Sequence, residues 1–407
     1  MPKNLSISDP VYGFIFMPYG LLTDVVAHPF FQRLRGIRQL GLSGLVYPGA
    51  QHTRFQHSLG AYHLMHEALA NLQFKGAFLF DTEVEAAEAA ILLHDIGHGP
   101  FSHVLENVLV PGLSHEDISL MMMQQMNREM NGQLSLAIKI FSDDYPKPFL
   151  HELICSQLDA DRLDYLSRDA FFTGVREGNI GTERIIRMLN LKDNHLVVES
   201  KGLYTIENYL LSRRLMYWQV YLHKTALAAE QVLRAAFRRA KWLAAQGVEL
   251  FATPALRYFL YQHVTADCFR QDGQSLHQYA MLDDTDVYAA LKNWVGADDV
   301  VLSTLARNFV GRNLFKAEMA DNQQQAAEMQ TYWQHEVARR LHISREDAAY
   351  LVGSKVVEKE MYSVTSEGIR MMSADGSTCD VTDVSQIVNV ENREVSDRKV
   401  YVFHHRL

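Results

Sequence analysis

The 407-residue sequence has little of several features that mark specialised classes of protein. Its three cysteines, Cys155, Cys268 and Cys379, are isolated and match neither a disulfide framework nor a zinc site. It has no low-complexity tract and no apolar run long enough to cross a bilayer. The first residues also lack the basic-then-apolar pattern of a secretory signal. We therefore expect a soluble globular protein of the reducing cytoplasm, without membrane contact.

The sequence also lacks an excess of positive charge. It has 39 Lys and Arg against 48 Asp and Glu, which gives a formal charge of −9. This balance argues against a general nucleic-acid coat, so we do not expect nucleic acid as a partner. A local cluster of Arg and Lys could still hold a smaller anionic ligand. The length and the 48% content of hydrophobic residues allow a sizeable core.

Apolar residues recur every three or four positions over most of residues 23–334, which predicts an all-helical body. Examples are residues 86–93, 210–243 and 300–305, the second of which we expect to be one long helix. Turn residues interrupt the pattern at residues 47–49, 97–100 and 145–148. Partial alternation over residues 190–205, with Asp193 and Asn194 within it, predicts a small inserted hairpin.

The pattern changes near residue 316. A polar helix is expected near residues 322–341, and short strands at residues 351–357, 369–373 and 378–381, with Asp375-Gly376 as a hairpin turn. We therefore predict a mainly α fold with a helical domain over residues 1–315 and a small C-terminal α+β subdomain over residues 316–407. Because no long Pro, Gly or Ser linker separates them, we expect the subdomain to pack on the helical body.

An adjacent His94 and Asp95 end an apolar helical segment, where neither side chain suits a core. A divalent metal can satisfy both, because it accepts imidazole nitrogen and carboxylate oxygen as ligands. A capping or hydrogen-bonded structural pair is the alternative. Upstream, helical spacing places His57 on one apolar face with Ala61 and Leu64, so His57 points inward.

The segment from Leu158 to Asp169 concentrates charge on one side of a predicted helix. Helical spacing brings together Asp161, Asp164, Tyr165, Arg168 and Asp169. A solvated helix face is the ordinary explanation for such a charge run. The tyrosine among the carboxylates and the candidate ligands elsewhere in the chain favour a functional site instead.

The ordered set His57, His94-Asp95 and Asp161 resembles the H…HD…D signature of HD phosphohydrolases, which implies an all-α fold and one bound divalent metal ion. More narrowly, the chain is similar to deoxynucleoside triphosphate triphosphohydrolases, including the vertebrate SAM-and-HD-domain enzyme and its bacterial relatives. This similarity runs from about Asp9 to about Lys316. It rests on residues 38–41, 47–50, 54–58, 94–103, 159–169 and 312–316.

The resemblance implies that His57, His94, Asp95 and Asp161 hold the metal. Two histidines and two carboxylates suit Mn, Fe, Zn, Ni or Mg. Such a site keeps coordination positions open and suits phosphate-ester cleavage. Peptide hydrolysis fits less well, because the sequence has no His-Glu-x-x-His element and no obvious Ser-His-Asp order.

Further site residues are implied by matching positions of the family. These assign acid–base work to His98, His115 and Glu116, and place His103 at the scissile phosphate; helix capping is the alternative for such histidines. Matching positions assign triphosphate contacts to Arg162 and Arg213, and contacts around the deoxyribose and base to Gln39, Tyr165, Asp169 and Tyr221. Arg54 flanks a metal motif and is a candidate phosphate ligand.

We therefore expect hydrolysis of deoxynucleoside triphosphates (dNTPs) to deoxynucleoside and inorganic triphosphate. The alternatives are an HD-type nucleotide phosphomonoesterase or phosphodiesterase, and a non-catalytic nucleotide-sensing or nucleic-acid-binding module. The family's habits imply a homodimer or homotetramer. A nucleotide activator is possible, although Ala27 stands where the vertebrate enzyme has an aspartate that reads guanine, while Gln32 and Arg35 match neighbouring positions.

Overall fold

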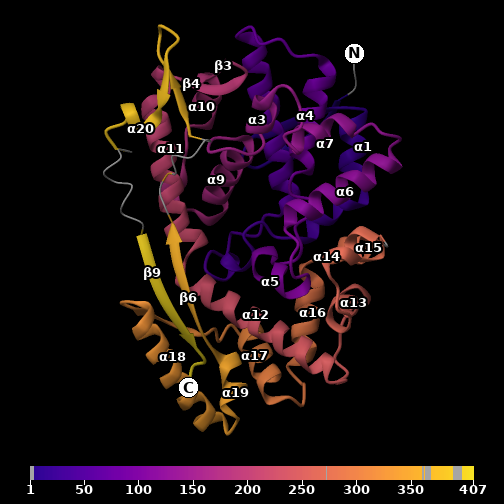
Figure 1. The fold of residues 1–407 in the computed structure, drawn as a ribbon, viewed down its shortest axis with the longest axis vertical. Helices are drawn as coiled ribbons and strands as arrows, with labels where there is room; N and C mark the ends of the chain where they lie inside the picture. Colours follow the sequence, from indigo (N-terminus) through magenta and orange to yellow (C-terminus); the bar gives the residue numbers. More distant parts are fainter. Residues whose placement is uncertain (1–3, 272, 360–361, 363–367, 388–396) are drawn as a thin grey trace.

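A bundle of helices from the first half of the chain carries the candidate metal ligands (Figure 1). The structure is a computed structural model that describes residues 4–271, 273–359, 362, 368–387 and 397–407. In it α3 (Arg54–Phe74) packs against both α4 (Asp81–Leu93) and α9 (Ala160–Thr173). The expected mainly α fold is confirmed.

Helix α3 begins with a capping box, in which the Gln56 side chain accepts the backbone N–H of Thr53 at 2.9 Å. The helix therefore starts three residues before His57. His57, Ala61 and Leu64 are buried, as their spacing predicts. Most residues of α3 are buried, and they lie on more than one face of the helix, because neighbouring elements cover it.

The helical body is completed by helices on both sides of this bundle. They are α1 (Leu21–Ala27), α2 (Pro29–Gln32), α5 (Ser102–Leu109), α6 (His115–Glu129), α7 (Ser135–Phe141), α8 (Pro148–Glu152), α10 (Thr182–Met188), α13 (Pro254–Tyr261), α14 (Ala266–Gln271), α15 (Gln274–Ala280), α16 (Asp284–Trp294) and α17 (Val300–Val310). None of the helices in the described part of the chain combines the length and the apolar character that a membrane crossing requires.

The prediction of a single helix over residues 210–243 is wrong, because the helix is interrupted. α11 (Leu203–Met216) runs into a π-helical turn at Tyr217–Tyr221, and α12 (Lys224–Ala245) then leaves in a new direction (Figure 1). Lys224, the first residue of the new helix, is exposed. A wide turn of this kind is frequent at functional sites.

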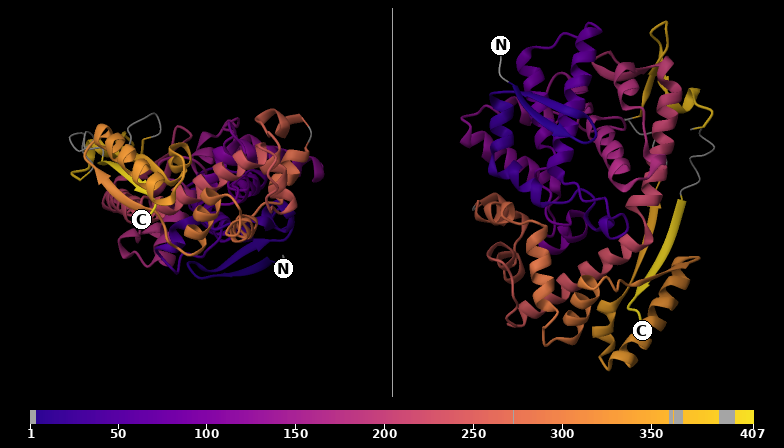
Figure 2. Two further views of the ribbon diagram at one scale, coloured as in Figure 1. Left: turned by 90° about the horizontal axis from the view of Figure 1, so that it is seen from below. Right: turned by 180° about the vertical axis from the view of Figure 1, so that it is seen from behind.

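In the described part of the chain, three small sheets accompany the helices. β1 (Asn4–Asp9) and β2 (Gly13–Pro18) form an N-terminal hairpin, visible in indigo from behind in Figure 2. The hairpin predicted within residues 190–205 is confirmed as β3 (Leu189–Lys192) and β4 (His195–Glu199). Its turn residues, Asp193 and Asn194, have φ of 53° and 62°, which short polar side chains tolerate.

The C-terminal region is tied to the helical body. β7 (Arg370–Met372) pairs with β8 (Thr378–Asp380) across the predicted Asp375-Gly376 turn, and also in parallel with β4 of the body. The third sheet has the order β5-β9-β6, from β5 (Lys316–Ala320), β9 (Asp397–His404) and β6 (Val352–Lys359). The helices of this region are α18 (Gln323–Leu341), α19 (Arg345–Ala348) and α20 (Val381–Val384). One hydrophobic core includes side chains from both regions.

Candidate metal centre

Three side chains from separate helices meet at one point. His57 comes from the first turn of α3, His94 caps the end of α4 and Asp161 lies in the first turn of α9. One ligand atom from each lies within 4.8 Å of the other two. Asp161 Oδ1 is 3.0 Å from His57 Nε2 and 3.5 Å from His94 Nε2.

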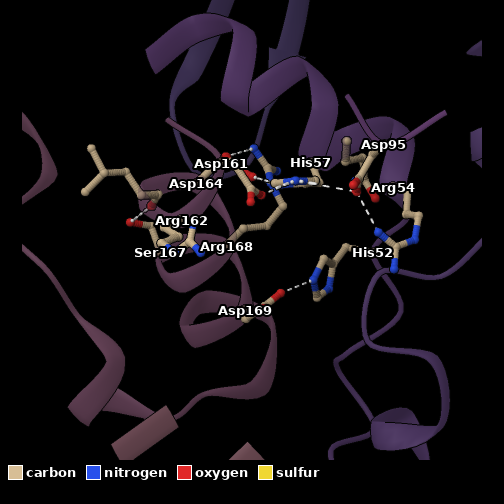
Figure 3. A network of polar contacts seen from close by, with 12 residues as sticks. His52, Arg54, His57, Asp95, Asp161, Arg162, Asp164, Ser167, Arg168 and Asp169 are labelled. Carbon is tan, nitrogen blue, oxygen red and sulfur yellow. Dashed lines mark hydrogen bonds and ion pairs between the residues drawn. The ribbon is translucent and has the colours of Figure 1, made fainter. Parts of the chain in front are cut away.

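Asp95 lies beside this group. Its Oδ1 is 3.4 Å from His94 Nε2 and its Oδ2 is 3.7 Å from His57 Nε2. The Arg54 guanidinium donates to Asp95 Oδ2 at 2.5 Å, so this carboxylate is held by a cation (Figure 3). Imidazole nitrogens and carboxylate oxygens that converge in this way fit a divalent metal ion.

The ring nitrogens of the two histidines that face away from this point have partners of their own. His94 Nδ1 is 2.6 Å from the Ile91 carbonyl oxygen, and His57 Nδ1 is 2.7 Å from Asp164 Oδ2. Each of these contacts orients its imidazole so that Nε2 faces the candidate metal position. Metal-binding histidines in proteins are supported in the same way.

A buried ion-pair chain extends behind His57. Arg168 donates to Asp164 through two nitrogens at 3.0 Å and to Asp9 Oδ2 at 2.8 Å, and all three side chains are buried. Gly60 makes room for this chain, because a Cβ there would lie 1.9 Å from Asp164 Oδ1. The N-terminal hairpin, which contributes Asp9, therefore supports a candidate ligand of the metal.

A cavity of about 380 Å³ opens at the front of the candidate metal centre. Its walls hold several side chains that sequence patterns and family resemblance single out. They are Gln39, Arg54, Asp95, His98, His103, His115, Asp161, Tyr165, Asp169 and Tyr221. The volume lies within the range of small-molecule sites.

Three histidine rings cluster along one wall of this cavity. His98 and His115 stack with ring centroids 3.9 Å apart, and His103 packs edge-on against both at 5.3 and 5.8 Å. Gly97 allows this close packing, since a Cβ there would lie 2.1 Å from the His115 carbonyl oxygen. His98 Nε2 also lies 3.3 Å from Asp95 Oδ1, which joins the cluster to the candidate metal centre.

Carboxylates surround His115. Its Nδ1 is 3.3 Å from Glu106 Oε1, and its Nε2 is 3.3 Å from the largely exposed Glu116. Partial burial alone would lower the pKa of His115, but the Glu106 hydrogen bond and the Glu116 charge outweigh it and raise that pKa. Burial, reinforced by the nearby Arg54 charge, holds the pKa of His98 well below its ordinary value. The two stacked rings therefore favour different protonation states.

Asp169 is fixed at another wall of the cavity by two groups. His52 Nε2 lies 2.7 Å from Asp169 Oδ1, and the Tyr221 hydroxyl donates to Oδ2 at 2.7 Å. Tyr165 packs edge-on against Tyr221, with ring centroids 6.0 Å apart. Helical spacing brings Tyr165 and Asp169 to the same face, as predicted from the sequence.

Arg162 and Arg213 lie beside the cavity and are not among its described wall residues. Arg162 forms an ion pair with the buried Asp159, and Arg213 donates to the Gln157 side-chain oxygen at 2.8 Å. Both guanidinium groups are near enough to Tyr165 for their charges to oppose the rise in its pKa caused mainly by burial. They approach the site without facing its open volume.

Gln32 and Arg35, the two residues that match activator-binding positions of the family, contact each other. Arg35 donates to Gln32 Oε1 at 2.8 Å, and its guanidinium lies 3.6 Å from the Phe55 ring centroid. Gln32 in turn donates to the Val26 carbonyl oxygen. A nucleotide activator stays a prediction.

Asp9, His52 and Glu106 were missed from the sequence. Asp9 and His52 are distant from their partners along the chain, so no local spacing indicates them. Glu106 precedes His115 by nine residues on a separate helix. The one available signal for Glu106 was its place among the histidines that follow the His94-Asp95 pair.

Comparison with known proteins shows which family the chain belongs to. The model of the HD domain matches residues 54–169, and that of the HD associated region matches residues 180–250. An uncharacterized protein of Bacillus subtilis, YwfO, is 35% identical over 328 residues, which cover 78% of this chain and 73% of that protein. The crystal structure of a phosphohydrolase from Bacteroides thetaiotaomicron is 52% identical, covers 100% of both chains and superposes with a TM-score of 0.95.

The relatives whose names include a substrate are more distant in sequence. The deoxynucleoside triphosphate triphosphohydrolase SAMHD1 homolog of Dictyostelium discoideum is 30% identical over 253 residues. SAMHD1 of Danio rerio is 27% identical over 279 residues. The matches cover 58% and 57% of this chain, and 49% and 44% of those proteins.

Proposed function

The chain belongs to the HD-domain family of phosphohydrolases, and on this premise we propose that it hydrolyses dNTPs to a deoxynucleoside and inorganic triphosphate. One observation carries this proposal. A single cavity joins the candidate metal ligands to a histidine cluster and to a wall built from Tyr165, Asp169 and Tyr221. The names of the SAMHD1 relatives support the choice of substrate.

We propose that His57, His94, Asp95 and Asp161 hold one divalent cation. When bound, such an ion supplies Lewis acidity toward phosphoryl oxygens and makes water more acidic. The carboxylates of Asp95 and Asp161 provide the negative charge that the cation requires. Arg54, which already contacts Asp95, is placed to donate hydrogen bonds to the phosphate and to offset part of its negative charge.

Proton transfer falls to the histidine cluster. His115, with Glu106 on one nitrogen and Glu116 near the other, is placed to hold a proton and to donate it to the leaving group. His98 is a neutral partner stacked on it, and His103 faces the scissile phosphate. A carboxylate behind an imidazole fixes its tautomer and stabilises the imidazolium.

We assign selection of the sugar to the wall built from Tyr165, Asp169 and Tyr221. Tyr165 would exclude a 2′-hydroxyl by bulk, while Asp169 and Gln39 accept the 3′-hydroxyl. In this proposal Arg162 and Arg213 exchange their contacts with Asp159 and Gln157 for the triphosphate. Such an exchange costs little if both arginines are close to the substrate, because a charged phosphate replaces the former acceptors.

The position of these two arginines also favours the second candidate, an HD-type nucleotide phosphomonoesterase or phosphodiesterase. That reaction needs the same ion but fewer triphosphate contacts, as expected if Arg162 and Arg213 keep their present partners. Phosphorus-31 NMR of products from all four dNTPs separates the two. Released inorganic triphosphate supports the first proposal, and released orthophosphate or nucleoside monophosphate supports the second.

We also propose that the protein works as a homodimer or homotetramer in the cytoplasm, as the family resemblance implies. Sedimentation at micromolar concentration tests the assembly. A fully active species at the 46.5 kDa monomer mass would contradict it.

A further inference from the structure

A second cavity lies where α12 meets the C-terminal region. It measures about 570 Å³, and its described lining shares no residue with that of the cavity at the candidate metal centre. α12 supplies one wall, and residues of α18, α19 and β6 supply the others. Figure 1 shows these elements together below the helical bundle. The volume is again typical of small-molecule sites.

Two arginines dominate the charge of this second cavity. Arg234 and Arg238 lie one turn apart on α12 and both line it, against the one acidic lining residue, Glu346. Within the described residues neither arginine forms an ion pair with a carboxylate. The adjacent Arg239 differs, because it bridges Asp299 at 2.6 Å and Asp347 at 2.7 Å. Like charges at this spacing repel each other, so the pair is destabilising until an anion binds.

The neighbouring groups match a phosphate-bearing ligand. Ser354 donates to Gln330 Oε1 at 3.1 Å, so the amide nitrogen of Gln330 remains available as a donor. The Tyr350 ring, 5.9 Å from the Arg238 guanidinium carbon, adds a flat apolar surface. Planar guanidinium groups bind phosphate oxygens bidentately. We propose that this cavity binds a small phosphate-bearing anion.

The second cavity is also linked to the first. Gln231 lines the second cavity, while the preceding residue, Glu230, lines the first. Ser354 lines the second cavity, and the following residue, Lys355, forms an ion pair with Glu230 at 3.2 Å. The wall from α12 and the wall from β6 therefore each adjoin the ion pair between Glu230 and Lys355, which borders the candidate active site. Occupancy of the anion site changes turnover through this ion pair, and that consequence rests on the proposed function.

Calorimetric titration of the full-length protein with pyrophosphate, in EDTA to suppress binding at the metal centre, tests the site directly. Arg234→Gln combined with Arg238→Gln should weaken binding about tenfold or more, since charge-assisted hydrogen bonds are lost. The matched control changes Arg339 and Arg340, two arginines of α18 outside the cavity lining, to Gln and should leave affinity unchanged. Arg234→Lys with Arg238→Lys keeps the charge and should bind with intermediate affinity, which guards against a folding defect.

Titration with ADP identifies the source of the phosphate. Tighter binding of ADP than of pyrophosphate, lost in the same double variant, indicates a nucleotide, and weaker binding indicates an inorganic or simpler phosphate. Equal pyrophosphate affinity in the wild type and the Arg→Gln double variant, or no binding by the wild type, overturns the proposal. Because binding is measured without turnover, this outcome is separate from any failure of the proposed activity.

The Glu230 link has its own test. Saturating pyrophosphate should change the KM for substrate about fivefold or more, and Lys355→Met should remove that change while keeping pyrophosphate affinity. A Lys355→Met protein that responds like the wild type contradicts the link.

Discussion

The ion-pair chain at the rear of the candidate metal centre and the cavity walls at its front differ in how their polar side chains are partnered. At the rear, His57, Asp164, Arg168 and Asp9 form a continuous buried chain of hydrogen bonds and ion pairs. At the front, buried polar atoms lack partners in the part of the chain that the structure describes. These atoms are Gln39 Oε1, Arg54 Nε and His98 Nδ1.

This difference separates two tasks. Buried polar atoms are normally hydrogen-bonded, so unpartnered ones that surround a cavity indicate groups whose partners come with a ligand. The chain behind His57 instead fixes a ligand geometry before any substrate arrives, which lowers the cost of ordering it. Changes at front residues other than the candidate ligands should therefore reduce turnover and spare the metal, and changes at the ligands or at the rear should weaken metal binding.

The largest separation is expected from His115→Gln. Turnover should fall about 10²- to 10⁴-fold, the usual contribution of general acid–base catalysis, with metal content unchanged. Single-turnover kinetics beside metal analysis measure both quantities. A variant that lost its metal would place His115 with the rear of the site.

Asp164→Asn tests the rear. It removes the charge that orients His57 and pairs with Arg168, so metal affinity should fall about 10- to 100-fold. The matched control is Glu67→Gln, an exposed carboxylate on the same helix as His57. Competition with a fluorescent chelator gives the affinities, and equal values for Asp164→Asn and the control would remove the supporting role.

Tyr165→Ala sharpens the comparison within the front. The preference for a dNTP over the matched NTP should shrink, by about tenfold to a hundredfold, because the ring no longer excludes the 2′-hydroxyl. Metal content should stay constant. The ratio of kcat/KM values in the two proteins decides, and an unchanged ratio makes Tyr165 a packing residue.

The smallest effect is expected from Glu106→Gln, which should shift the dependence of activity on pH. Glu106 raises the pKa of His115 against the opposing effect of burial, so protonated His115 persists above its ordinary range and activity falls as pH rises through that raised pKa. Removing the carboxylate charge should move this alkaline fall to lower pH. A shift in the opposite direction, or none, would show that protonated His115 is not the acid.

Spacing along the sequence predicted the parts of the site that are local in the chain. The inward face of His57 and the shared face of Asp161, Tyr165 and Asp169 follow from helix geometry alone. The contact between Asp9 and Arg168 spans 159 residues, and that between His52 and Asp169 spans 117. Tertiary packing creates such pairs, so no window of sequence contains them.

The fold shows the same limit. The hairpin at Asp193 and Asn194 was predictable because its turn residues are adjacent. β5 and β9 were not predicted, since each completes a sheet with a partner about 80 residues away. The break between α11 and α12 was also missed, because Tyr217–Tyr221 keeps an apolar helical pattern through the π-helical turn.

The most direct test of the division between rear and front is metal stoichiometry measured beside turnover in two variants of the cavity. Asp161→Ala removes a candidate ligand, and His103→Gln removes a cavity histidine that is outside the candidate ligand set. We expect both variants to lose dNTP hydrolysis, Asp161→Ala without bound metal and His103→Gln with the wild-type amount. Stoichiometric metal in Asp161→Ala, or its loss from His103→Gln, would contradict the assignment of these two sides.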